Sequence, residues 1–136
     1  MKKILLFAVA IVIMTMVVSC GSGNSPKGVA NQSMECLKNK DFKGYSELMY
    51  FSKKDLENPE KVQKEKETYQ GLLQKAYAQR TEGQGDIKDY SVVNEQVNDS
   101  VAVVKMAIVS TTDQNDTIDI KLRKDDSGAW KIDTNK

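Results

Sequence analysis

The sequence predicts an α+β domain in which N-terminal helices pack on a curved antiparallel sheet of about four strands. Apolar residues recur at helical spacing from residue 29 to about residue 81, and β-branched residues dominate from residue 87 onward. The breaks between the later segments are short and rich in turn-forming residues, which favours antiparallel hairpins. Helices followed by strands are typical of a fold with its helices on one face of the sheet.

Three helices are expected in the first half of the chain. The first covers residues 29–38, and Asp41 is placed to cap a second, short helix. Ser52 and Asp55 have the spacing of a capping arrangement. Pro59 fits the first turn of a third helix, which is expected to end near Thr81. The apolar stripe expected along that third helix consists of Val62, Tyr69, Leu72, Leu73 and Ala76.

Four strands are expected in the second half, over residues 87–97, 101–110, 117–124 and 129–133. Residues 101–109 are apolar on both faces except at Lys105, which indicates a central strand. In the following segment Ile118, Ile120 and Leu122 alternate with charged residues. This alternation predicts a strand with one buried face.

The first twenty residues have the layout of an export signal. Lys2 and Lys3 precede an apolar run over residues 4–18 that only Thr15 interrupts. This run is short for a membrane span, which needs about 20 apolar residues. Small residues follow it, and residues 17–21 read Val-Val-Ser-Cys-Gly.

Residues 17–21 resemble the lipobox of bacterial lipoprotein precursors. The resemblance implies that residues 1–19 are removed and that Cys20 is acylated, which links the chain to a lipid bilayer. Two or more acyl chains give stable anchoring. Gly21 is not the acidic signal for inner-membrane retention, so the resemblance implies the outer membrane. Some bacteria export lipoproteins to the cell surface with an acidic cluster just after the cysteine, and residues 21–28 contain none, which favours the periplasmic face. The alternative interpretation is an ordinary secretory signal with a chance cysteine.

Removal of the signal changes the charge balance. The full chain of 136 residues has 20 basic and 19 acidic residues, hence a net charge of +1. Loss of Lys2 and Lys3 leaves 18 basic against 19 acidic residues, so the processed chain carries −1. This near neutrality argues against nucleic acid as a partner. Residues 20–28 are rich in Gly, Ser, Asn and Pro, which predicts a flexible tether before a domain over residues 29–136.

Three further segments carry a family resemblance. Residues 36–42 read Cys-Leu-Lys-Asn-Lys-Asp-Phe, and residues 118–122 and 128–132 read Ile-Asp-Ile-Lys-Leu and Gly-Ala-Trp-Lys-Ile. Together they resemble a family of uncharacterised Gram-negative lipoproteins with a nuclear-transport-factor-two-like (NTF2-like, or cystatin-like) cone domain. The resemblance spans about residues 26–133 and implies a curved sheet around a helix, with room for a pocket. This superfamily contains enzymes, binding proteins and dimers, so the fold does not settle the function.

The chain contains no histidine, so the His–Asp pair that enzymes of the cone fold often use is impossible. Glu47 and Glu95 are candidates for a buried catalytic carboxylate, but no nucleophile–base–orienter set is visible. The sequence therefore favours a non-catalytic module that binds an unknown small molecule or protein. The alternative is a small cone-fold hydrolase or isomerase that uses a buried carboxylate.

Five side chains are candidates for lining a ligand cavity, because Tyr and Trp combine apolar area with a polar tip. They are Tyr45, Met49, Tyr69, Tyr77 and Trp130. The alternative interpretation is an ordinary core between helices and sheet. No cofactor or metal site is predicted, because residues 113–124 lack the Gly and Glu that a calcium loop requires.

Three smaller hypotheses concern single residues. Cys36 lies on the apolar face of the first expected helix and is predicted to pack as a buried free thiol. Ser100 and Thr117 lie in Asp-Ser-Val and Asp-Thr-Ile triplets, which resemble the acceptor motif of an O-glycosylation system in some Gram-negative periplasms. A homodimer through the outer face of the sheet, where Lys105 and Lys121 are expected, is a further hypothesis.

Overall fold

The computed structural model describes residues 24–134, and both the signal segment and Cys20 lie outside them. The helices of this part are α2 (Pro26–Lys38), α3 (Phe42–Ser46), α4 (Lys53–Leu56) and α5 (Pro59–Thr81). The strands are β1 (Ile87–Asn98), β2 (Val101–Ser110), β3 (Asn115–Lys124) and β4 (Trp130–Ile132). All four strands pair antiparallel in the order β1-β2-β3-β4. The predicted α+β class with a four-stranded meander is confirmed.

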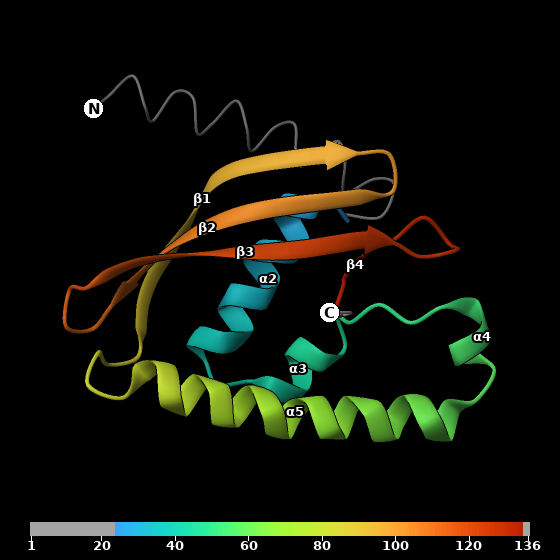
Figure 1. Ribbon diagram of the computed structural model, residues 1–136, viewed down its shortest axis with the longest axis horizontal. Coiled ribbons are helices and arrows are strands. Elements are labelled where there is room, and N and C mark those ends of the chain that lie inside the picture. Colours follow the sequence, from blue (N-terminus) through green and yellow to red (C-terminus); the bar gives the residue numbers. More distant parts are fainter. Residues whose placement is uncertain (1–23, 135–136) are drawn as a thin grey trace.

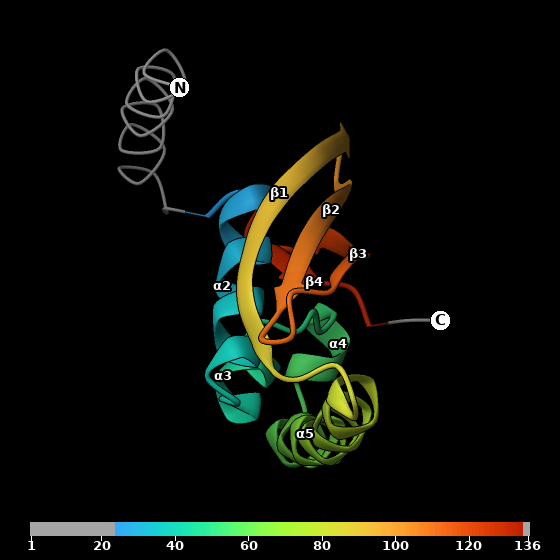
Figure 2. The same ribbon diagram turned by 90° about the vertical axis from the view of Figure 1, so that its left-hand side faces the viewer.

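The helices lie on one face and at one end of the sheet. In Figure 1, α2 lies behind the bent strands and α5 runs along the bottom of the molecule. Figure 2 shows α2 beside β1, with α5 below both α2 and the sheet. Because α5 crosses the end of the sheet rather than its centre, α2 is the helix that covers most of the buried face.

Side-chain caps set the starts of the short helices. Asp41 accepts a hydrogen bond from the backbone N–H of Gly44 at 2.9 Å, at the start of α3. Ser52 and Asp55 form a reciprocal capping box around α4. The predicted caps are confirmed, because each depends on residues only three positions apart.

The first helix begins earlier than the sequence indicated. Ser25 caps α2 by accepting a hydrogen bond from the backbone N–H of Gly28 at 3.0 Å, and Pro26 occupies the first turn. Residues 26–28, expected within a tether over residues 20–28, are therefore helical. Asn24 is also held, because its side-chain Nδ2 donates to the backbone oxygen of Trp130 at 3.1 Å. The expected tether boundary was wrong because Ser and Pro are helix-start residues as well as linker residues.

The core lies between α2 and the sheet. β2 is an interior strand of the sheet, as predicted, and alternate residues along it are buried in the core beneath α2. The most deeply buried side chains come from α2, β2 and β3 and include Val29, Met34, Val104, Met106 and Leu122. Alternate burial along β2 and β3 leaves the other face of the sheet to polar side chains and partly exposed valines.

The predicted apolar stripe of α5 is only partly buried. Val62 is buried, and Tyr69 and Leu73 are half-buried, but Leu72 is 59% exposed and Ala76 is also exposed. Tyr77 is buried in their place. A helix that crosses the end of a sheet buries a narrower line of residues than one lying across its middle, and helical spacing alone does not distinguish the two positions. Within residues 24–134, no helix has the length and hydropathy needed to span a bilayer.

Candidate functional site

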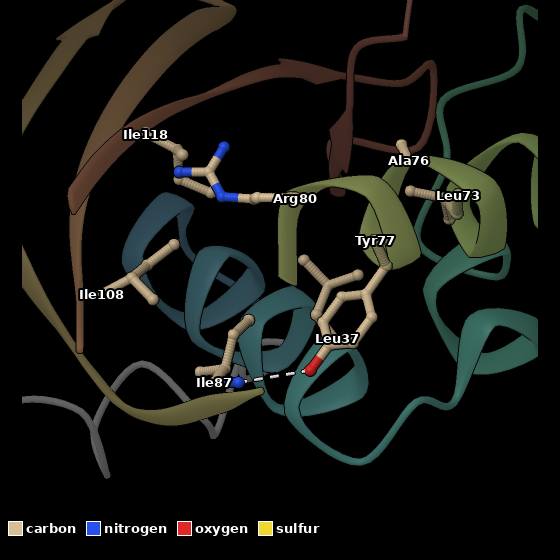
Figure 3. Close-up of a pocket in the computed structure, with 8 residues that line it drawn as sticks. All are labelled: Leu37, Leu73, Ala76, Tyr77, Arg80, Ile87, Ile108 and Ile118. Atoms are coloured by element: carbon tan, nitrogen blue, oxygen red, sulfur yellow. Dashed lines mark hydrogen bonds between the residues drawn. The ribbon is translucent and has the colours of Figure 1, made fainter. Parts of the chain in front are cut away.

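A cavity of about 200 Å³ lies between the C-terminal half of α5 and the end of the sheet where β1 begins. Its walls come from α2, α5 and the first three strands, so five elements meet around it (Figure 3). Six aliphatic side chains form most of the wall: Leu37, Leu73, Ala76, Ile87, Ile108 and Ile118. An aliphatic wall of this kind suits an apolar ligand.

Tyr77 supplies a polar atom within this wall. Its hydroxyl oxygen accepts a hydrogen bond from the backbone N–H of Ile87 at 3.2 Å (Figure 3). The Phe42 ring packs edge-on against the Tyr77 ring, with centroids 5.9 Å apart and planes at 65°. These contacts fix the ring and tie α5 to the first residue of β1. A hydroxyl that accepts one hydrogen bond still carries its own hydrogen, which can be donated to a bound acceptor.

Arg80 provides the charge at this site. Among the described residues that line the cavity, Arg80 alone is ionised at neutral pH. It lies three positions after Tyr77 and four after Ala76, which places it on the same side of α5. Its guanidinium forms an ion pair with Asp116 of β3. The two side chains are 42% and 53% exposed, so the pair stands at the surface rather than inside the cavity.

The five side chains predicted to line a ligand cavity do not converge on one site. Tyr77 lines the cavity described above, whereas Met49 and Tyr69 line a separate open groove of about 390 Å³ beside α5. Tyr45 is buried and stacks on Tyr69, with ring centroids 6.2 Å apart. Trp130 is buried against the core and holds Asn24 through its backbone. The structure therefore brings the five together only in part.

Patterns in the sequence did not predict most of the residues that line the cavity. The sequence predicts Leu73 and Ala76 as part of a buried stripe and gives no role to Arg80. A signal was present, because Leu73, Tyr77 and Arg80 recur at spacings of four and three residues along α5. A cation that continues an apolar stripe at helical spacing is a pattern that could have indicated the mouth of a pocket.

The candidate catalytic carboxylates lie away from this cavity. Glu47 accepts a hydrogen bond from Lys66 Nζ at 3.0 Å, and its side chain is 56% exposed. Glu95 lies on β1 with an oxygen 3.9 Å from Lys27 Nζ. Neither residue lines the cavity.

Cys36 is half-buried on α2 and packs against the core. Burial raises the pKa of its thiol above the ordinary value, and the nearby carboxylates of Asp41 and Glu35 raise it further. A thiol with a raised pKa is a weak nucleophile near neutral pH, because the thiolate is the reactive form.

The remaining predicted sites stay predictions. Ser100, in the turn between β1 and β2, and Thr117, on β3, are both exposed, and Cys20 lies outside the described residues. Lys105 and Lys121 are exposed on the sheet face opposite α2, where Lys105 Nζ lies 3.5 Å from Asp119. Within residues 24–134, no group of three or more His, Cys, Asp or Glu residues is arranged to hold a metal ion.

Comparison with known proteins gives similarity at the level of structure. No protein-family model matches the sequence, and no curated protein matches it. A solved structure of a proposed NTF2-like transpeptidase from Campylobacter jejuni aligns with a TM-score of 0.64 at 16% identity, covering 82% of this chain and 99% of that one. A SEC-C motif containing protein from Rhodopseudomonas palustris aligns with a TM-score of 0.49 at 14% identity, covering 82% and 77%. The helices, the curved four-stranded sheet and the first of these neighbours together show that the chain has the NTF2-like α+β cone fold.

Proposed function

We propose that this chain is a lipoprotein held at the periplasmic face of the outer membrane by acylated Cys20. Its domain acts as a non-catalytic module that binds a small apolar ligand in the cavity beside α5. The anchoring part rests on the lipobox-like residues 17–21. The binding part rests on the cavity formed by α2, α5 and the first three strands.

The single observation that carries the binding proposal is the cavity with its aliphatic wall. Its volume is about 200 Å³. An apolar protein cavity of about 150 Å³ is large enough to hold benzene. Tyr77 and Arg80 are the lining residues that carry polar side-chain atoms, with the charged end of Arg80 at the surface, and a few polar groups beside an apolar wall are typical of sites that orient a ligand.

Catalysis by this domain is supported less well. Glu47 and Glu95, the carboxylates that a hydrolase or isomerase would need, pair with lysines away from the cavity. The name of the Campylobacter neighbour suggests transpeptidation, a reaction that enzymes often run through an activated Ser or Cys nucleophile. Burial raises the pKa of Cys36, which makes its thiol poorly suited to that role.

The binding proposal is tested by filling the cavity from its rim. Ala76→Phe puts a ring into the lining from an exposed helix position, and Ala78→Phe is the matched control at an exposed position of α5 outside the lining. Titration with 1-hexanol, followed by backbone amide NMR, is expected to shift Ile87, Ile108 and Ile118 in the original protein and in Ala78→Phe. Ala76→Phe is expected to abolish these shifts. Equal shifts in all three proteins would contradict the proposal.

The anchoring proposal is tested with Cys20→Ala. Membrane fractionation is expected to find the original protein in the outer membrane and to find the variant no longer anchored there through lipid. Intact-mass spectrometry is expected to show acyl chains on the original protein. A variant that stays fully membrane-bound, or a protein without acyl mass, would rule out lipid anchoring through Cys20.

A further inference from the structure

We infer that the ligand of this cavity is a small apolar carboxylic acid whose carboxylate replaces Asp116 on the guanidinium of Arg80. This inference rests on the proposed binding function and names the ligand class. Three features carry it: the position of one cation at the rim of an aliphatic wall, the exposed side chains of its ion pair, and the place of Asp116 in the sheet.

The position of Arg80 suits recognition of a carboxylate. In Figure 3 its guanidinium lies beside Ile118, at the opposite side of the cavity from the Tyr77 hydroxyl. Arg80 is the one ionised residue of the wall in the part of the chain that the structure describes. A guanidinium presents its N–H donors in a planar fork that matches the two oxygens of a carboxylate. An acid whose apolar body lies against the isoleucines would therefore present its carboxylate to this fork.

In the structure, the side-chain carboxylate of Asp116 already occupies the position beside the Arg80 guanidinium. It pairs across the sheet with Ile108, and Ile118 follows two positions later on the same face of β3. Both isoleucines line the cavity, so Asp116 stands next to its wall. The Asp116 side chain therefore marks where a ligand carboxylate would bind to Arg80.

Replacing the Asp116 carboxylate by a ligand carboxylate on Arg80 costs little free energy. The side chains of Arg80 and Asp116 are 42% and 53% exposed, and ion pairs at that exposure contribute little to stability. When the Asp116 carboxylate separates from Arg80 it is hydrated again, while the apolar body of the ligand is removed from water. The burial of that body favours the exchange.

A single negative charge fits this site better than two. Two other cations at this end of the molecule are engaged away from the lining, with Lys40 Nζ 3.0 Å from Asp86 and Lys88 Nζ 3.0 Å from Asp113. A dianion such as a phosphate monoester would bring excess negative charge close to Asp116. The charge of Arg80 is balanced by one carboxylate.

The test compares two ligands with the same six-carbon chain, hexanoate and 1-hexanol. Full-length protein in a non-ionic detergent is titrated with each, and binding is read from the backbone amides of Ile87, Ile108 and Ile118. Each ligand is compared with itself across protein variants, so that its partition into detergent cancels. Arg80→Gln is expected to weaken hexanoate about tenfold, the effect of losing a charge-assisted bidentate contact. The same variant is expected to change the affinity for 1-hexanol much less than the affinity for hexanoate, because the alcohol carries no charge for Arg80 to balance.

Substitution of Asp116, the partner of Arg80 in the ion pair, is expected to strengthen the binding of hexanoate. Asp116→Asn removes the competing carboxylate, so hexanoate is expected to bind more tightly, by about three- to tenfold, with no change for 1-hexanol. Asp113→Asn is the matched control, because Asp113 lies in the same hairpin and pairs with Lys88 outside the lining. It is expected to change neither ligand.

The outcomes separate the two proposals. If 1-hexanol binds but Asp116→Asn fails to strengthen hexanoate, or Arg80→Gln fails to weaken it, the carboxylate inference is wrong and the binding function stands. If neither ligand shifts the cavity amides of the original protein, the proposed binding function fails. The amide spectra also report whether each variant is folded, so a loss of binding through unfolding is recognised directly.

Discussion

The Tyr90 hydroxyl donates a hydrogen bond to Glu35 Oε1 at 2.6 Å, which joins β1 to α2. Burial and the neighbouring Glu35 carboxylate raise the pKa of Tyr90 to about 12. The same hydrogen bond, with a second from Asn39, holds the pKa of Glu35 below its ordinary value of 4.5. A contact between one side chain on each element thus ties the edge strand to the helix that fills the core.

Tyr90→Phe is expected to lower the free energy of unfolding in a pH-dependent way. The folded pKa of Glu35 is lower than its unfolded pKa, so the stabilisation is present above the unfolded value and is lost as pH falls through the folded value. The variant is therefore expected to be less stable than the original protein at neutral pH and to approach it as the pH falls below the lowered pKa of Glu35. Urea unfolding across this range measures both proteins. A difference that stays constant with pH would contradict this assignment.

Cys36 is expected to react slowly with iodoacetamide in the folded protein. Its pKa is raised by burial, then by Asp41 and Glu35, so the thiolate fraction at neutral pH is smaller than for an exposed cysteine. Intact-mass spectrometry is expected to show alkylation several-fold slower in native buffer than in urea. Equal rates under the two conditions would show that neither burial nor the neighbouring charges protect the thiol.

At the scale of elements, the longer helix α5 contributes fewer buried residues than the shorter helix α2. α5 has 23 residues but buries only Val62 and Tyr77, whereas the 13-residue α2 buries five residues along its length. The difference arises because α2 packs on the face of the sheet and α5 crosses its end (Figure 1). The shorter helix therefore carries more of the core.

Truncation on the two helices is expected to differ accordingly. Met34→Ala on α2 removes a fully buried side chain and is expected to cost about 2–5 kcal/mol of unfolding free energy. Leu72→Ala on α5, where the side chain is 59% exposed, is expected to change stability by less than about 0.5 kcal/mol. Urea unfolding of both variants checks this. Similar costs for the two would mean that α5 packs more tightly than its exposure indicates.

At the scale of the whole molecule, Asn24, the first described residue, and the cavity lie at opposite ends of α2. Asn24 is held on Trp130, so only residues 21–23 separate it from Cys20, a reach of at most about 14 Å. α2 then runs about 20 Å from the end near Asn24 to Leu37 at the cavity. Under the proposed anchoring, we expect the cavity to lie farther from the bilayer than Asn24 does.

This orientation predicts a difference between two labelled positions. Ser100 lies at the anchor end, because its backbone oxygen accepts a hydrogen bond from Lys124, which pairs with Trp130. Asp113 lies in the hairpin at the other end of β2. In a Cys36→Ser background, a dye on Ser100→Cys is expected to transfer energy to a dye-labelled lipid more efficiently than one on Asp113→Cys. Equal transfer from both positions would contradict the orientation.

The sequence was sufficient for features that depend on neighbouring residues. The caps at Asp41 and Ser52, the span of α5 and the central place of β2 follow from spacings of two to four positions, and all were predicted. The start of α2 was missed because the residues that open it are also typical of linkers. This error concerns only the few residues at the start of one helix.

The cavity was decided by the tertiary structure. Leu37, Arg80, Ile87, Ile108 and Ile118 are spread over five elements, and strand register together with the crossing of α5 brings them to one end of the sheet. By itself the sequence determined the fold class and the order of the elements, because these rest on local composition and periodicity. It left undetermined which apolar side chains pack and which line a space, because that depends on how far a helix lies from the strands it covers.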